Sequence, residues 1–314
     1  FRQIGHLLFS ILVCYFFLYL SSENLRKYNK LFFLFFLFFL ILVIIPGLGK
    51  TVNYSTRWLS YGGLNLQPSE FFKLFYIIWL CAYLDTNKKN IESVKIFMIP
   101  VVVFSISSLL LLLQPDFGST VIIFLITFIM LYIAKAKIIH LLTLLLFGLL
   151  NATILILLSD ERLSRFNFFE PCANYGGDGY HLCWSLMAIG SGGVFGKGLG
   201  ASTTKLSYLP EAHTDFIFAI LAEELGILGV IFTIVLFYLF IKKCFFIGDK
   251  SFRLGLIFQG YLSYAIGIFI ALQAFLNMSV NIGIVPTKGL ALPFFSYGGS
   301  NYLVSILSIA IILR

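Results

Sequence analysis

Residues 209–241 read LPEAHTDFIFAILAEELGILGVIFTIVLFYLFI. A polar loop ends here, and an apolar segment begins that is long enough to cross a bilayer, whose hydrocarbon core needs about 20 helical residues. Glu223 and Glu224 lie inside this segment, where a charged side chain must be paired, be neutral or line a wet cavity. Asp215 lies at its start. The stretch therefore predicts a membrane helix with functional polar groups at its beginning.

The composition of the whole chain indicates the same class of protein. Of its 314 residues, 60% are hydrophobic and 11% are charged, and the mean hydropathy is +0.97. A soluble domain carries about 25% charged residues. The net charge of +8 does not indicate nucleic-acid binding, because the basic residues are scattered over short connections. We therefore predict an all-α polytopic membrane protein without a soluble domain, a signal peptide or a nucleic-acid partner.

Nine apolar segments are candidates for spanning helices. They cover residues 4–20, 31–48, 70–85, 95–113, 118–134, 138–158, 216–241, 254–277 and 299–313. Lysine and arginine gather in alternate connections, near residues 26–30, 88–95, 135–137 and 242–253, which predicts that this side faces the cytoplasm. The longer connections are predicted to face outward, and they cover residues 49–69, 114–117, 159–215 and 278–298.

The first two outward connections contain charged candidates. Arg57 stands beside Trp58 and is interpreted as an interfacial anchor or as a ligand of a lipid phosphate. Glu70 follows a Gln-Pro-Ser helix start, and Lys73 lies one turn later on the same side. The two side chains are therefore expected to pair, for a structural or a functional purpose. Asp116, in Gln-Pro-Asp-Phe-Gly, is either a tight-turn residue or a site residue.

The central connection carries basic and glycine-rich motifs. Arg162 and Arg165 are three residues apart, so one helical face would present both to a phosphate. Residues 190–200 contain six glycines, but Lys197 lacks the neighbouring residues of a phosphate-binding P-loop. The glycines are instead interpreted as places where the backbone approaches a neighbour or a ligand closely.

The five cysteines form no Cys-x-x-Cys motif. Three of them lie in or beside apolar runs and are interpreted as small buried hydrophobic residues. Cys172 and Cys183 share the central connection and can form a disulfide if it faces an oxidising compartment. The sequence leaves this pairing open.

The motif Leu-Pro-Glu-Ala-His-Thr-Asp-Phe contains the main candidate for chemistry. Asp215 or Thr214 fits the N-cap of the following helix, so a purely structural role is one interpretation. Glu211 and His213 stand in the same loop. Glu223 follows Asp215 by eight residues, which is about 80° round a continuous helix and roughly 12 Å along it. This spacing predicts a polar groove that opens outward at Asp215.

The last outward connection carries Lys288 among turn residues, and Ser296 and Ser300 on either side of a glycine pair. One interpretation is a tight re-entrant turn before the final helix. The other is a site of backbone N–H groups and a lysine that binds an anionic head group.

Taken together, these motifs resemble the SEDS family of bacterial membrane proteins, which comprises FtsW, RodA and their relatives. The motifs are RW…GG…QPSE..K, QPDFG, R..RF..P…GY, SGGVFGKGLG, LPEAHTDFIFA..AEELG and PTKGLALPFFSYGGS. They cover nearly the whole chain, and YLPEAHTDFIF and PTKG are closer to the FtsW, cell-division branch than to RodA. The family has ten spanning helices, so one membrane domain over residues 1–314, with an extracytoplasmic loop at 159–215, is expected to lack the first. His181 and Trp184 depart from the Gln or small polar residues expected after Gly-Tyr.

The resemblance implies a peptidoglycan glycosyltransferase in the inner membrane, active on the outer side at the division septum. Its substrate would be lipid II, a disaccharide-pentapeptide on undecaprenyl pyrophosphate, and its partners a class B penicillin-binding protein and other division proteins. The acidic residue that the family requires corresponds to Asp215, which would be the general base.

The resemblance also implies a set of binding residues. The expected cations for the pyrophosphate are Arg57, Lys73, Arg162, Arg165, Lys197 and Lys288, with or without a divalent ion such as Mg²⁺ or Mn²⁺. No other cofactor is expected. Glu211, His213, Ser296 and Ser300 are expected to contact substrate, and Glu70, Asp116, Glu223 and Glu224 to form the polar groove.

Two other functions stay open on the sequence alone. A transporter that flips lipid II would also carry polar residues within its spans, such as Lys73, Glu223 and Glu224. A division scaffold would use its outer loops only to dock partners, and it would tolerate the loss of Asp215.

Overall fold

The computed structural model describes residues 2–19, 21–52, 55–61, 64–157, 172, 179–206, 209–286 and 289–314. The chain divides into two compact units. Unit 1 comprises Phe1–Gly148, Lys242–Ile270 and Gly298–Arg314, and unit 2 comprises Leu149–Ile241 and Ala271–Tyr297. A single membrane domain over residues 1–314 stays a prediction.

The helices follow the predicted apolar segments. In the described residues they are α1 (Arg2–Leu18), α3 (Asn29–Ile44), α4 (Pro68–Asn87), α5 (Val94–Leu113), α6 (Phe117–Ile133), α7 (Ile138–Leu157), α10 (Ile217–Arg253), α11 (Ile257–Asn281) and α12 (Gly299–Leu313). By length and composition, α5, α7, α10 and α11 are long and apolar enough to cross a membrane. The helical, multi-pass class is therefore confirmed, whereas the number of spans stays a prediction.

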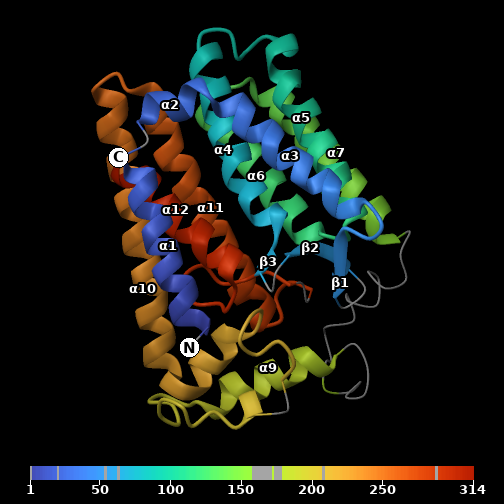
Figure 1. Cartoon of the computed structure of the whole chain (residues 1–314), viewed down its shortest axis with the longest axis vertical. Helices are drawn as coiled ribbons and strands as arrows, with labels where there is room; N and C mark the ends of the chain where they lie inside the picture. The colour runs from blue at the N-terminus through green and yellow to red at the C-terminus, as the bar shows by residue number, and fades with distance from the viewer. Residues whose placement is uncertain are drawn as a thin grey trace. The chain divides into compact units, whose positions relative to one another are not determined.

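Unit 1 is built from helices that pack along their lengths. α3 packs against α4 and α5, α4 also contacts α6 and α12, and α1 lies along α12 (Figure 1). The ring of Phe36 on α3 stacks on Phe71 and Phe75 of α4, at centroid distances of 5.5 and 4.4 Å. Stacked rings give close contact between helices that lack small residues at their interface. α4 is buried along most of its length, and it carries Glu70 and Lys73.

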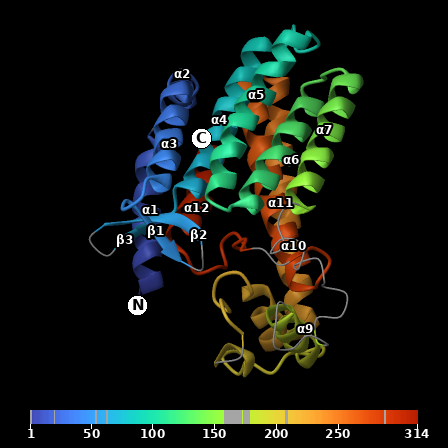
Figure 2. The same cartoon turned by 90° about the vertical axis from the view of Figure 1, so that its right-hand side faces the viewer.

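The first outward connection folds into a small antiparallel sheet, which the sequence did not predict. β1 (Gly49–Val52), β2 (Ser55–Tyr61) and β3 (Leu64–Leu66) lie in the order β1-β2-β3. β2 is rich in β-branched and aromatic residues, which favour strands. The sheet contacts α3, α4 and α12 (Figure 2), and Arg57 lies on its central strand. In the described residues the fold is therefore helical with one small sheet.

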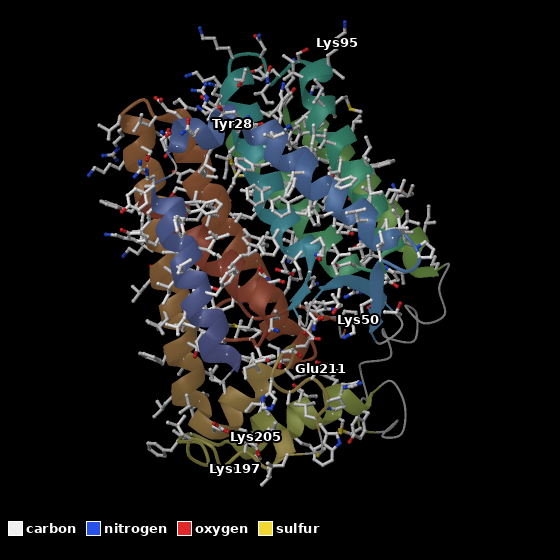
Figure 3. The ribbon with its side chains drawn as sticks, viewed as in Figure 1. Tyr28, Lys50, Lys95, Lys197, Lys205 and Glu211 are labelled. Atoms are coloured by element: carbon white, nitrogen blue, oxygen red, sulfur yellow. A yellow bond between two sulfur atoms is a disulfide. The ribbon has the colours of Figure 1, made fainter. Side chains whose placement is uncertain are left out.

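In unit 1, the connections predicted to be cytoplasmic and the first connection predicted to face outward lie at opposite ends. Figure 3 places Tyr28 and Lys95 at one end of this unit and Lys50 at the other. The short helix α2 (Ser22–Lys27), capped by Ser21, lies in the first basic connection. The connections predicted to be cytoplasmic thus lie together, away from the sheet.

α10 differs from the predicted span 216–241 in two ways. First, it continues to Arg253, so the predicted basic loop 242–253 is wrong. Lysine is a good helix former, and cations near a helix C-terminus interact favourably with its dipole, so the helix extends through this segment. Second, the helix breaks at Gly226 (φ 66°, ψ −166°), so Glu223 and Glu224 precede the break and the helix is not continuous from its start.

Unit 2 contains α9 (Tyr180–Ser191), the short 3₁₀ helix η1 (Thr204–Leu206) and the first part of α10. Its described core joins α9 to the start of α10 and consists of Ala188, Leu209, Ala212, Phe216, Ala219 and Ile220, flanked by Trp184 and Ile189. Cys172 forms a disulfide with Cys183 of α9, which settles the pairing that the sequence left open. Of the predicted outer loop 159–215, residues 159–171, 173–178, 207 and 208 lie outside the described part of the chain.

Candidate active site

A tight turn organises the segment that carries Asp215. The N–H groups of Thr214, Asp215 and Phe216 all donate to the carbonyl of Glu211, at 3.1, 3.1 and 3.3 Å. Glu211 has a φ of 53°, in the left-handed region that few non-glycine residues adopt. Its carboxylate accepts a hydrogen bond of 2.8 Å from the Thr214 hydroxyl. In this structure Glu211 therefore shapes the turn, and its role in substrate binding stays a prediction.

The carbonyl groups of three successive residues, 213–215, are all bound by donors from the last part of the chain. The donors are the N–H of Tyr297 at 2.8 Å, the hydroxyl of Ser296 at 2.6 Å, and the side-chain amides of Asn277 at 2.8 Å and Asn281 at 3.1 Å. We call this set of bonds the carbonyl clamp. It fixes the main chain on both sides of the Asp215 carboxylate.

The Asp215 side chain itself is half-buried. Gly289 lies against it, since a Cβ built on Gly289 would be 2.9 Å from Asp215 Oδ2. His213 is exposed beside it. Lys288, which precedes Gly289, lies outside the described residues. The main chain of Asp215 is thus held in place, while its side chain remains partly accessible.

A second polar cluster lies in unit 1, where Lys73 and Glu70 of α4 form the predicted ion pair. Lys73 Nζ is 2.8 Å from Glu70 Oε1, and the two residues are 0% and 6% exposed. Lys73 Nζ also lies 5.6 Å from the centre of the Phe269 ring, within the range of a cation–π interaction. The pair is confirmed, while any contact with substrate stays a prediction.

Asp116 belongs to the same cluster and caps α6. Its carboxylate accepts the N–H and the hydroxyl of Ser119, at 3.2 and 2.8 Å. Arg57 of β2 donates to the carbonyls of Gln114, at 3.2 Å, and Pro115, and so holds the turn before Asp116. Burial acts to raise the pKa of Asp116, but Arg57, Lys73 and Ser119 together bring it below its ordinary value. Its contribution to stability is therefore present at neutral pH and is lost only when the pH falls through that lowered pKa.

The glycine-rich loop after α9 binds both glutamates of α10. Glu223 is 0% exposed and accepts hydrogen bonds from Lys197 at 2.7 Å, from Ser202 at 2.6 Å, and from Thr203 and Thr204. Glu224 accepts from Lys205 at 2.5 Å and from the N–H of Gly200 at 3.0 Å. Figure 3 shows Lys197 and Lys205 at one end of unit 2, farther along than Glu211. Charges in such a segment were expected to be paired, to be neutral or to line a wet cavity, and the structure shows that both glutamates are paired with lysines. The predicted polar groove stays a prediction.

Close backbone approach explains two of the glycines of this loop, Gly192 and Gly196. A Cβ on Gly192 would lie 2.1 Å from the carbonyl oxygen of Ala222, and one on Gly196 would lie 2.1 Å from that of Glu224. Gly196 also has a φ of +76°. The interpretation of the glycines as points of close approach to a neighbour is confirmed for Gly192 and Gly196, whereas a Cβ on any of the other four would have nothing within 4 Å.

Gly192→Ala is expected to lower the melting temperature of the protein, because the new methyl group would overlap the Ala222 carbonyl. Overpacking of this kind costs about 1–3 kcal/mol. Gly190→Ala is the matched control, since a Cβ there has nothing within 4 Å and alanine favours a helix. Thermal unfolding in detergent would compare the two. Equal melting temperatures would contradict the proposed packing of the loop on α10.

Comparison with known proteins decides the family. A sequence model of the FtsW/RodA/SpoVE family, described as "Cell cycle protein", matches residues 1–314. The chain belongs to the FtsW/RodA/SpoVE family. The resemblance found in the sequence is thereby confirmed.

Curated members of the FtsW/RodA/SpoVE family are similar along most of this chain. A probable peptidoglycan glycosyltransferase FtsW of Nitrosococcus halophilus is 45% identical over 272 residues, which is 86% of this chain and 70% of the relative. Proteins of the same description from Coxiella burnetii and Haemophilus influenzae are 43% and 42% identical, over 92% and 100% of this chain and 78% and 79% of theirs.

Solved structures of FtsW/RodA/SpoVE-like proteins share the fold. A chain from a peptidoglycan synthase complex, solved to explain the coordination of polymerization and crosslinking, has a TM-score of 0.81 and 25% identity, covering 99% of this chain and 87% of that one. The rod shape determining protein RodA of Thermus thermophilus has a TM-score of 0.73 and 25% identity, covering 99% and 85%.

The predicted site residues of this FtsW/RodA/SpoVE-family chain belong to both units. Asp215, His213, Glu211 and Ser296 lie together in unit 2, and Glu70, Lys73, Asp116 and Arg57 lie together in unit 1. Lys197 pairs with Glu223, and the Ser300 hydroxyl accepts the N–H of Gln67 at 3.0 Å. Arg162, Arg165 and Lys288 lie outside the described residues.

Asn277, Asn281 and Gly289 contact the Asp215 segment, and they were not among the predicted site residues. Asn277 and Asn281 had one detectable signal. A buried amide in an apolar run is costly in a membrane helix and therefore marks a specific bond. Gly289 had no such signal, because glycine is common in turns.

The described residues do not form a metal site of their own. No group of three or more His, Cys, Asp or Glu side chains lies close enough together among them to hold a metal ion.

Proposed function

We propose that this chain is a peptidoglycan glycosyltransferase that polymerises lipid II, with Asp215 as its general base. The observation that carries the proposal is the carbonyl clamp, which holds the main chain of residues 213–215 while the Asp215 carboxylate remains half-buried. A buried structural carboxylate would need no such access. The names of the curated relatives support the same enzyme class.

The reaction that this carboxylate would serve is the transfer of a sugar to a sugar hydroxyl. The hydroxyl oxygen attacks the anomeric carbon of the donor, and its proton passes to a carboxylate oxygen of Asp215. The new glycosidic C–O bond forms as the bond from the anomeric carbon to the pyrophosphate breaks. Lipid pyrophosphate leaves with the electron pair of that bond.

Cations are needed where the pyrophosphate leaves. Arg162, Arg165 and Lys288 are the proposed ligands, because Lys73 and Lys197 are already paired with Glu70 and Glu223. A divalent ion, if required, would arrive with the pyrophosphate of the substrate rather than on a preformed protein site. A reaction that is insensitive to EDTA would remove the metal from the proposal without affecting Asp215.

The proposed place of action is the outer face of the inner membrane at the division septum. The distribution of lysine and arginine in the sequence supports the outward orientation of residues 159–215. The proposed partner is a class B penicillin-binding protein, which would crosslink the strands made here, together with other division proteins. The similarity to a chain of a peptidoglycan synthase complex supports such a partnership.

Transport of lipid II is the competing function, because Lys73 and Glu70 place a buried ion pair within an apolar helix. The two functions separate in one experiment on purified protein in liposomes that contain labelled lipid II. Glycan polymer resolved on a gel supports polymerisation, provided that Asp215→Asn abolishes it. Movement of lipid II between leaflets without polymer, with or without the penicillin-binding protein, would overturn the proposal in favour of a flippase.

Gly289→Ala is expected to slow polymerisation while the protein stays folded. The new methyl group would lie 2.9 Å from Asp215 Oδ2 and would displace the carboxylate. A displacement of about 1 Å costs roughly 100-fold in rate. The measurement is the rate of glycan formation per folded molecule, with Gly190→Ala as the control. A rate equal to that of wild type would show that the carboxylate beside Gly289 is not the reacting group.

A further inference from the structure

Two asparagines of α11 hold the residue that carries the carboxylate. Asn277 and Asn281 lie four residues apart, on one face of the helix, and are 1% and 0% exposed. Both side-chain amides donate to the main-chain carbonyl of Asp215, at 2.8 and 3.1 Å. Asn277 also donates to the carbonyl of Leu290, at 2.5 Å, in the segment that leads away from Gly289. These amides therefore tie Asp215 to α11 and to the loop on its other side.

Asn281 makes a second bond at the start of α10. Its Oδ1 accepts the N–H of Ala219, at 3.2 Å, in the first turn of that helix, and the same N–H also donates to the carbonyl of Phe216 at 3.1 Å. N–H groups in a first helical turn lack a full set of partners within the helix, and a side chain of the capping residue normally accepts one of them. The residue before α10 is Phe216, whose side chain has no acceptor. An amide from another helix thus takes a capping bond of the kind that Thr214 or Asp215 was expected to make.

An amide can do both things from one side chain, because its donor and its acceptor are separate atoms. Asparagine has an acceptor oxygen and a donor nitrogen, whereas aspartate when ionised only accepts and alanine does neither. Ser185 of α9 adds support, because its hydroxyl donates to the main-chain carbonyl of Asn281 at 2.8 Å. The hydrogen bond from Ser185 of α9 thus holds Asn281, and the side chain of Asn281 in turn holds the main chain of Asp215.

We propose that Asn281, assisted by Asn277, is the positioning residue for Asp215 in glycosyl transfer. Its amide nitrogen fixes the main chain at Asp215, and its oxygen accepts the first-turn N–H of Ala219 in place of a local carboxylate. The inference rests on the proposed function of Asp215. It adds that the rate of the reaction depends on two uncharged side chains that touch neither donor nor acceptor sugar.

Asn281→Asp separates the two roles of the side chain. The aspartate keeps an oxygen for the Ala219 N–H, next to the positive end of the α10 dipole, but it has no donor for the Asp215 carbonyl. The turnover number for lipid II polymerisation is expected to fall by about 100-fold, with KM for lipid II nearly unchanged. Asn277→Ala removes the bonds that Asn277 donates to Asp215 and Leu290, together with the long bond of 3.4 Å that its Oδ1 accepts from Asn281, and a fall of about tenfold or more is expected. A merely structural role would reduce the yield and the melting temperature but not the turnover number per folded molecule.

Ser263→Ala is the matched control on the same helix. It removes one buried hydrogen bond, from Ser263 to the carbonyl of Cys244 at 2.7 Å, and Ser263 belongs to unit 1 rather than to the Asp215 cluster. Its turnover number is expected to equal that of wild type. If Asn281→Asp also turns over at the wild-type rate, the proposal is overturned.

Two further results bear on the positioning role: a failure of Asn281→Asp to fold, and the activity of Asp215→Asn. Should Asn281→Asp not fold, Asn277→Ala decides, and a wild-type turnover number in that variant overturns the proposal. Asp215→Asn, measured in parallel, tests the proposed function on its own. If Asp215→Asn is inactive while Asn281→Asp and Asn277→Ala are fully active, only the positioning role is rejected. If Asp215→Asn is active, the role of Asp215 as general base is rejected.

Discussion

Asp215→Asn is expected to abolish glycan polymerisation from purified lipid II while the protein still folds. Asparagine has the shape of aspartate but cannot accept the proton of the attacking hydroxyl, and general-base catalysis contributes about 10²–10⁴-fold to a rate. The carbonyl clamp acts on main-chain oxygens, so it is retained in the variant. The measurement is gel-resolved glycan, made with the partner penicillin-binding protein present.

Glu92→Gln is a suitable control for that experiment. Glu92 is an exposed carboxylate between α4 and α5, in a connection predicted to face the cytoplasm. Its removal changes the net charge by the same amount as Asp215→Asn but is expected to leave the rate unchanged. Polymer made by Asp215→Asn at the rate of this control would rule out the general base.

Lys73→Met is expected to have the largest effect on stability. The change leaves Glu70, which is 6% exposed, without its cation, and it removes one of the positive charges that act on Asp116. Removal of one partner from a buried ion pair costs about 3–5 kcal/mol, because the other charge stays buried and uncompensated. Thermal unfolding in detergent measures the loss. The double variant Lys73→Met/Glu70→Leu is expected to recover part of it, since no charge of the pair is then left behind.

An ion pair with an exposed cation provides the control for this second experiment. Arg26 bonds Asp85 at 2.7 Å, and their side chains are 53% and 9% exposed. Because water screens the exposed guanidinium, this pair contributes less to stability than a fully buried one, and Arg26→Met is expected to shift the melting temperature less. If Lys73→Met shifts it no more than Arg26→Met does, the pair on α4 is not a buried structural element.

Much of the fold could be predicted because it depends on local patterns. Apolar runs of about 20 residues mark the helices wherever polar groups cannot be satisfied outside a helix. The ion pair of Glu70 and Lys73 follows from their spacing on one helical turn, and 2.8 Å separates them in the structure. The glycine-rich pattern of residues 190–200 likewise predicted the close approach that the structure has at Gly192 and Gly196.

The rest could not be predicted because it depends on contacts between distant residues. Asn281 and Asp215 are 66 positions apart, and Ser296 and Thr214 are 82 apart, so no local pattern reveals the carbonyl clamp. The sequence carried no sign of the helix break at Gly226, because single glycines are common in long apolar segments. The break occurs because Gly226 meets the backbone of Val194 and Gly196, where a Cβ would lie within 2.7 Å of their atoms.

The carbonyl clamp also has a consequence for the thermodynamics of the reaction. Its four hydrogen bonds form when the protein folds, so the backbone of residues 213–215 is already ordered before a substrate arrives. The entropy of that ordering is lost once during folding and does not recur in each catalytic cycle. The activation entropy of sugar transfer should therefore contain little contribution from this loop, and a substrate mimic should bind there without a slow rearrangement.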